Sequence, residues 1–195
     1  MNFPIIKISN LQTYIYYKFL NINYRLTMIR PTRDQYFMLS AIMMATRASC
    51  IKFRSWAVIV KNNRIVASGY NWNPKWITSC HEQWFCNKDK ANVDWTQKWS
   101  WHCLATHAEA NAIIQNHEQS LEWATMYCLH FPCNECAKLI VSSWIKEVVY
   151  LKMYRETVSN SEMMFNQAWV KFRKMELDHE QSIENIKEVM TSTKE

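Results

Sequence analysis

Residues 131–140 have the sequence FPCNECAKLI, and residues 107–114 have the sequence HAEANAII. In both, residues that bind metal come first and an apolar pattern at helical spacing follows. Pro132 precedes the first cysteine at the expected start of a helix, where its missing N–H costs nothing. Cys133 and Cys136 then fall in the first turn, whose free N–H groups favour thiolates. The two stretches therefore predict two helices with reactive side chains at their N-terminal ends.

One histidine and two cysteines in these stretches form a set of zinc ligands. His107 lies 26 residues before Cys133, and Cys136 completes a Cys-x-x-Cys pair. Three protein ligands leave the fourth position of a tetrahedral zinc open, which is typical of a catalytic site and not of a structural one. Glu109 follows the histidine closely, and a carboxylate there can carry a proton between water and substrate. The pattern His-x-Glu with Pro-Cys-x-x-Cys is the signature of zinc nucleobase deaminases.

Helices alternate with strands on both sides of these stretches. Helical spacing predicts helices over 34–49, 107–115, 133–143, 161–168 and 182–189. Runs of β-branched residues predict a hairpin over 56–68. Further strands are expected over 124–130, 147–151 and 170–175. This order predicts an α/β fold, a three-layer sandwich with a mixed five-stranded sheet and helices on both faces.

The chain divides into three expected parts. Residues 28–177 would form the deaminase domain, and residues 178–195 a charged C-terminal helix or tail. Residues 1–27 would be an N-terminal extension outside the native chain, because Met28 is an alternative start.

Composition narrows the class of protein. The 195 residues are 49% hydrophobic and 21% charged, which excludes a disordered chain. The net charge of +6 suits an anionic nucleotide, a polynucleotide or simply a basic surface. No apolar run approaches the roughly 18 residues that span a membrane. Seven cysteines without a recognisable secretory signal favour the reducing cytoplasm and metal ligation over disulfides.

From these residues outward, the sequence resembles the deoxycytidylate (dCMP) deaminase family of the zinc-dependent cytidine deaminase superfamily. The resemblance runs from about residue 30 to residue 175 and is carried by RPTRDQYFM (30–38), AVIV and RIVASGYN (57–71), HAEANAII, ATMY (124–127), FPCNECAKLI and IKEVVY (145–150). It implies a cytidine deaminase-like fold and the hydrolysis of dCMP to dUMP and ammonia for thymidylate synthesis. By position, the resemblance assigns zinc binding to His107, Cys133 and Cys136, proton transfer to Glu109, and a hydrogen bond with the substrate's sugar to Asn71.

The resemblance also implies features that the residues alone leave open. Some members carry a second, structural zinc, and Cys50 and Cys80 match two of its ligand positions. Cys86 and Cys103 are the candidates for the other two ligands, and four unligated thiols are the alternative. Many members are homo-oligomers that dCTP activates and dTTP inhibits. No membrane or nucleic-acid partner is expected.

Two alternatives to a dCMP deaminase remain. One is another small deaminase that acts on a free nucleoside or a tRNA base. The other, from a different class, is a zinc-stabilised nucleic-acid binding module. Such a module has no use for Glu109 beside an open zinc site, so this residue favours an enzyme.

Glycine and tryptophan occur at abnormal frequencies. The chain has 1 Gly and 10 Trp, whereas glycine averages about 7% of residues and is needed wherever φ is positive. In the family pattern, glycine stands where this chain has Trp56, Trp72, Trp123, Trp144 and Trp169, and Trp76 is a sixth candidate. These exchanges suggest UGA codons that mean glycine but have been translated as tryptophan. Gly69 would then be the residue written with a standard glycine codon.

Overall fold

The computed structural model describes residues 30–94, 102–116, 120–153 and 159–192. Contacts divide the chain into a unit of residues 32–177 and a second unit made of the two ends, 1–31 and 178–195. Helix α8 (His179–Ser192) belongs to the second unit and includes the predicted helix 182–189. The predicted extension 1–27 and Met28 lie outside the described residues. No helix in the described ranges is both long and apolar enough to cross a membrane.

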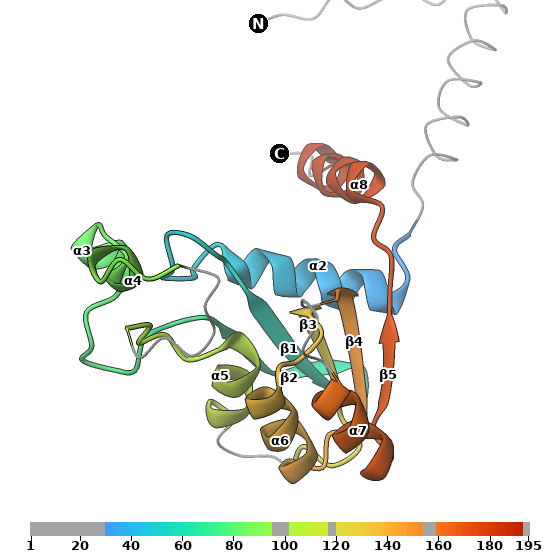
Figure 1. Cartoon of the computed structure of the whole chain (residues 1–195). Helices are drawn as coiled ribbons and strands as arrows, with labels where there is room; N and C mark the ends of the chain where they lie inside the picture. The colour runs from blue at the N-terminus through green and yellow to red at the C-terminus, as the bar shows by residue number, and fades with distance from the viewer. Residues whose placement is uncertain (1–29, 95–101, 117–119, 154–158, 193–195) are drawn as a thin grey trace, which may run out of the picture. The chain divides into compact units, whose positions relative to one another are not determined.

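The main unit contains a mixed five-stranded sheet. Its strands are β1 (Trp56–Lys61), β2 (Arg64–Tyr70), β3 (Thr125–His130), β4 (Glu147–Lys152) and β5 (Lys171–Lys174). They lie in the order β2-β1-β3-β4-β5, as Figure 1 shows. Strand β1 pairs antiparallel with β2 and β3, whereas β3–β4 and β4–β5 are parallel. The predicted strands and the mixed sheet are therefore confirmed.

Helices cover both faces of the sheet. Helix α2 (Arg33–Ala45) lies on one face, and α5 (Ala108–Ile114), α6 (Asn134–Ser142) and α7 (Ser159–Gln167) lie on the other (Figure 1). Side chains alternate between the two resulting cores, because neighbouring residues of a strand point to opposite faces. Val58 packs with α2 residues, whereas its neighbour Ile59 packs with Ala108 and Ala112 in the other core. The three-layer α/β sandwich is confirmed.

Two short helices were not predicted. Helices α3 (Cys80–Gln83) and α4 (Asn87–Lys90) interrupt the long polar segment between β2 and α5. Each is four residues long, which is too short to show a helical period in the sequence. Ser79 caps α3, accepting from the backbone N–H of Glu82 while Glu82 accepts from the N–H of Ser79. Local capping therefore orders a segment that reads as a loop.

Within the ranges that the structure describes, positive φ angles occur at two kinds of residue. Three asparagines have them: Asn62, Asn63 and Asn92. Five tryptophans also have them: Trp76, Trp84, Trp123, Trp144 and Trp169. Asparagine tolerates this conformation, whereas a bulky residue in it is an outlier. Four of the six tryptophans that the sequence marked as glycine positions are thus left-handed. Trp56 and Trp72 are not, and Trp84 was not among the six.

The edge strand β5 is tied to the rest of the sheet by Arg173. Its guanidinium lies 2.8 Å from a carboxylate oxygen of Asp34, in α2, and 2.8 Å from one of Glu147, in β4. The hydroxyl of Tyr127 donates to the other oxygen of Asp34 at 2.7 Å. These two ion pairs therefore link β5 to helix α2 and to its neighbouring strand β4.

Candidate metal centre and active site

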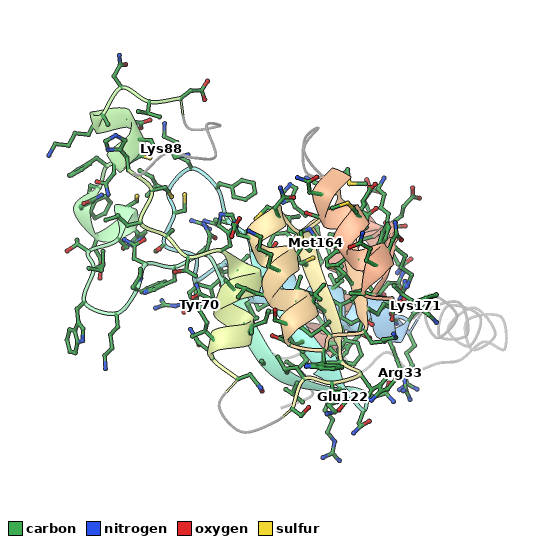
Figure 2. All side chains as sticks on the ribbon, turned by 60° about the horizontal axis from the view of Figure 1, so that its bottom comes forward. Arg33, Tyr70, Lys88, Glu122, Met164 and Lys171 are labelled. Carbon is green, nitrogen blue, oxygen red and sulfur yellow. The ribbon has the colours of Figure 1, made fainter. Side chains whose placement is uncertain are left out.

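The three predicted metal ligands come together at the N-terminal ends of two neighbouring helices. His107 is the N-cap residue of α5, and Cys133 is the N-cap residue of α6. Cys136 lies in the first turn of α6. Figure 2 shows α5 and α6 side by side on the same face of the sheet. The chain reaches α6 directly from the carboxyl end of the central strand β3, so the end of this strand positions the cysteine pair.

The donor atoms are spaced as a tetrahedral zinc site requires. Nδ1 of His107 lies 3.5 Å from Sγ of Cys133 and 3.5 Å from Sγ of Cys136. Zinc–nitrogen and zinc–sulfur bonds of about 2.0–2.1 and 2.3 Å give a tetrahedron with nitrogen–sulfur edges of about 3.5 Å. Within the described ranges, this is the one group of three His, Cys, Asp or Glu residues whose ligand atoms approach so closely. The residues present therefore fit a zinc ion held through Nδ1 of the histidine.

Exposure is graded across the site. His107 is exposed, Cys133 is partly buried, and Cys136 is buried. Glu109 is only 7% exposed. Three ligands, open on one side and buried on the other, would leave a zinc ion accessible from the surface. This donor set is consistent with a catalytic zinc site, because a structural one is closed by four protein ligands.

The two thiols and the imidazole shift one another's pKa values. The Cys136 thiol and the His107 ring stabilise the Cys133 thiolate by hydrogen bonds, which lowers the pKa of Cys133 to about 3. The bond to Cys133 in turn raises the pKa of His107 to about 9, and the charge of Glu109 acts in the same direction. The neighbouring Cys133 and burial raise the pKa of Cys136. At least one sulfur is therefore a thiolate at neutral pH, which is the form that binds zinc.

Glu109 is a buried carboxyl directly beside the ligands. It lies in the first turn of α5, two residues after His107. Burial raises its pKa, and the charge of Cys133 acts in the same direction while His107 opposes it. A raised pKa makes it easier for a carboxyl both to accept and to release a proton near neutral pH. Glu109 therefore lies beside the metal ligands, and its role as proton carrier stays a prediction.

Close packing fixes the position of α5 on the sheet. Gly69 of β2 faces α5, and a Cβ on it would lie 2.2 Å from the carbonyl oxygen of Ala108 and 2.4 Å from the nitrogen of Ala112. Glycine therefore lets the backbone of the helix that carries Glu109 approach the strand.

Asn111 also holds the start of α5, a role that the sequence analysis missed. Its amide nitrogen donates to the carbonyl oxygens of Tyr70 at 2.8 Å and Thr106 at 3.4 Å. Thr106 immediately precedes His107, so the contact orients the backbone at this metal ligand. One signal was present in the sequence: Asn111 is four residues after His107 and shares its side of the helix.

Asn71, the predicted sugar contact, is buried at the end of β2. Its side-chain oxygen accepts from the backbone N–H of Ser55 at 2.8 Å. Its side-chain nitrogen donates to the carbonyl oxygen of Phe53 at 2.8 Å. The amide therefore holds the segment before β1, and the contact with a sugar stays a prediction.

The four remaining candidate metal ligands lie near one another. The N–H of His81 donates to the carbonyl oxygen of Ser49 at 3.0 Å, which brings together the chain segments of Cys50 and Cys80. Burial raises the pKa of Cys80, and the charges of Cys86, Cys50 and Cys103 raise it further. Among the described residues, however, no three of these sulfurs lie within ligating distance. The second metal therefore stays a prediction.

Comparison with known proteins identifies the family. The family model described as "Cytidine and deoxycytidylate deaminase zinc-binding region" matches residues 31–152. The deoxycytidylate deaminase of Saccharomyces cerevisiae is 38% identical over 132 residues, which cover 66% of this chain and 40% of the yeast protein. The human deoxycytidylate deaminase is 35% identical over 144 residues, which cover 72% of this chain and 78% of the human one. The matched region spans only 40% and 38% of the S. cerevisiae and Schizosaccharomyces pombe enzymes.

A solved structure agrees with these relatives. The dCMP deaminase from the cyanophage S-TIM5, crystallised with dCMP and dUMP, superposes with a TM-score of 0.60 at 25% identity. The match covers 75% of this chain and 99% of the phage protein. The matched region includes all three metal ligands and Glu109. The chain therefore belongs to the dCMP deaminase family, within the superfamily of zinc-binding cytidine and deoxycytidylate deaminases.

Proposed function

We propose that this protein is a zinc-dependent hydrolase that converts dCMP and water to dUMP and ammonia, and so supplies dUMP for thymidylate synthesis. The observation that carries the proposal is the buried Glu109 carboxyl beside a three-ligand zinc site with one open side. A binding module would need neither the open side nor the carboxyl.

The residues divide the chemistry between them. His107, Cys133 and Cys136 would hold the zinc, which when bound makes a water molecule a better nucleophile. Glu109 takes one proton from the attacking water and delivers it to N3 of the ring as the C4–O bond forms. It then takes the proton of the new C4 hydroxyl and delivers it to the amino group, so that the C4–N bond breaks as the C4=O double bond forms and ammonia leaves. The raised pKa of Glu109 suits both halves of this transfer.

Lys88 favours a phosphorylated substrate. This lysine of α4, labelled in Figure 2, is only 8% exposed. It is close enough to the zinc site for its charge to lower the pKa of His107. A nucleotide phosphate near this cation would gain an ionic contact that a nucleoside cannot make. This supports dCMP over deoxycytidine as the substrate.

We also propose the second, structural zinc, with Cys50, Cys80, Cys86 and Cys103 as ligands. The segments of Cys86 and Cys103 both border one hollow, lined by Asn87 and Lys90 on one side and by His102 and Leu104 on the other. A closed four-cysteine site would tie α3, α4 and the segment before α5 together. The paired variant Cys50→Ser/Cys80→Ser should lose one equivalent of zinc and retain the other, whereas an unchanged zinc content would contradict this site.

The remaining expectations concern the enzyme's setting. We propose a cytoplasmic homo-oligomer that dCTP activates and dTTP inhibits, as the family resemblance implies. All seven cysteines are free, which supports a reducing compartment. Activity at subsaturating dCMP should rise with dCTP and fall with dTTP, and mass measurement in solution should give more than one chain per particle.

The decisive assay measures ammonia release from dCMP, CMP, deoxycytidine and dCTP, with the wild-type protein and Glu109→Gln. We expect dCMP to be the best substrate and the variant to be inactive. Equal activity of both proteins would refute the mechanism. A preference for deoxycytidine would refute the substrate and favour a nucleoside deaminase, and zinc content without any deamination would favour a binding module.

A further inference from the structure

Five tryptophans lie in the left-handed region, with φ between 57° and 73°. The Cβ of an L-residue clashes with the backbone in this conformation, whereas glycine adopts it freely. The seven described tryptophans thus include five in the conformation least suited to them. The hydrogen bonds around each position show what kind of turn requires it.

Trp144 ends helix α6 in a Schellman motif. The N–H of Ile145 donates to the carbonyl oxygen of Ile140 at 3.3 Å, and the N–H of Trp144 donates to that of Val141 at 3.1 Å. These two bonds define the motif, and they place Trp144 at the C′ position. Glycine is the usual residue there, because C′ must be left-handed.

Trp169 ends helix α7 in the same way. The N–H of Val170 donates to the carbonyl oxygen of Phe165 at 2.9 Å, and the N–H of Trp169 donates to that of Asn166 at 3.3 Å. The two helices therefore end with the same motif, and tryptophan occupies the glycine position in both.

Trp76 and Trp123 are each the third residue of a tight turn. The N–H of the last residue donates to the carbonyl oxygen of the first at 3.1 Å in the turn 74–77 and at 3.0 Å in the turn 121–124. In each turn the third residue has positive φ and the second does not, as in a type II turn. This position calls for glycine or asparagine.

Trp84 is the C-cap residue of α3, with φ 61° and ψ 12°. Like the other four, it has an exposed side chain. The exposed fractions of the five range from 69% to 89%. The indoles therefore bury little apolar surface to offset an unfavourable backbone.

We propose that all five positions are glycine in the native protein: Trp76, Trp84, Trp123, Trp144 and Trp169. At these positions the gene would carry the codon UGA, which the native host would read as glycine. Tryptophan would stand in the printed sequence because the codon was translated with a different genetic code. The backbone conformation at each site favours glycine over tryptophan, independently of the proposed enzymatic function.

An exposed aromatic residue can also be an anchor for a partner, since tryptophan is enriched at binding hot spots. Binding would explain tryptophan at one or two sites on a common surface. It does not explain why each of the five occupies the left-handed position of a turn. Glycine explains all five from one cause.

Three further positions, Gly69, Trp56 and Trp72, show where the backbone argument stops. Gly69 has no positive φ, and it is required because helix α5 leaves no room for a Cβ. Trp72 has ordinary φ and pairs with Thr106 in a β-bridge. Trp56 also has ordinary φ, although its indole nitrogen is buried and has no acceptor among the described residues. Backbone geometry therefore assigns five positions and leaves these two to the family resemblance.

Two measurements test the proposal. Codon sequencing, with peptide mass spectrometry of the protein from its native host, should find UGA and glycine at all five positions. UGG codons or tryptophan-containing peptides at Trp144 and Trp169 would overturn it.

The second measurement uses the recombinant chain with the printed sequence. Trp144→Gly and Trp169→Gly should each raise the folded-to-unfolded ratio about five- to thirty-fold. The matched variants Trp144→Ala and Trp169→Ala, which keep a Cβ, should gain less. Alanine variants as stable as the glycine variants would also overturn the proposal, because bulk and not the left-handed backbone would then be the problem.

Discussion

The backbone N–H of Trp123 donates to the carbonyl oxygen of Trp144, with an N···O distance of 3.2 Å. Both residues are left-handed, and each precedes one of the parallel neighbours β3 and β4. The turn that leads into one strand thus supports the turn that leads into the next. A backbone adjustment that relieved one tryptophan would disturb the other.

Substitution of Trp144 by glycine should stabilise the recombinant chain. Removing the Cβ from a left-handed residue relieves about 1–2 kcal/mol, and urea unfolding should show a higher midpoint. Trp72→Gly is the matched control: it removes the same side chain from a residue with ordinary φ, so it should stabilise nothing. An equal gain at both positions would mean that the bulk of the indoles, and not the backbone angle, limits stability.

Substitution of Gly69 by alanine should destabilise the protein and lower its activity. The new Cβ would meet backbone atoms of α5 at 2.2 and 2.4 Å, and overpacking typically costs about 1–3 kcal/mol. Because α5 carries Glu109, its displacement should also lower kcat. Ser68→Ala, at the neighbouring strand position, should change neither. A Gly69→Ala protein of normal stability would show that β2 and α5 lie farther apart than this structure has them.

Substitution of Glu109 by glutamine should abolish proton transfer without removing the metal. We expect kcat to fall about 10²–10⁴-fold, the usual contribution of a general acid–base, while zinc content stays at the wild-type level. Glu135→Gln is the control, since Glu135 lies in the first turn of α6 but pairs with Lys138 at the surface. Loss of zinc from Glu109→Gln would instead assign the residue a structural role.

Substitution of Lys88 by methionine should weaken binding of the nucleotide's phosphate. A hydrogen bond to a charged group contributes about 1.5–3 kcal/mol, so KM for dCMP should rise at least tenfold. The slower reaction of deoxycytidine, which has no phosphate, should be unaffected. Lys90→Met, on the same helix but packed over the ring of Phe85, should leave both substrates unchanged. An equal loss with both substrates would place Lys88 in the scaffold.

Acidification should destabilise the fold through His130. Burial, with a smaller effect of Lys152, lowers the pKa of His130 to about 4, whereas an unfolded histidine has a pKa near 6.5. Between these values the unfolded chain binds the extra proton, so stability falls as pH drops from about 6.5 to about 4. His130→Gln, which does not titrate, should lose less stability than wild type between pH 7 and pH 5 in urea unfolding. Identical losses would contradict the shifted pKa.

The parts of the fold that the sequence predicted are those written in short-range patterns. Strands β1 and β4 show β-branched runs, and α5 and α6 carry their metal ligands at their starts. The ligand set could be found because a zinc deaminase needs these residue types at these helix ends. Local order of this kind does not depend on distant parts of the chain.

The missed features depend on contacts between distant residues. Asn71 binds backbone atoms of Phe53 and Ser55, and no local pattern shows this clamp. Gly69 is required by the close approach of the backbone of α5 and not by its own backbone angles. Trp84 ends a helix of four residues that has no period to read. Each depends on a neighbour that only the folded chain supplies.

The short, basic strand β5 has a consequence for self-association. An edge strand presents unpaired backbone groups to any other strand, and charged side chains discourage that pairing. Three of its four residues are cationic, and Arg173 is anchored by two carboxylates. Two copies brought together at this edge would set like charges against each other. Chains that assemble should therefore avoid this margin of the sheet, and β5 should not seed amyloid-like growth.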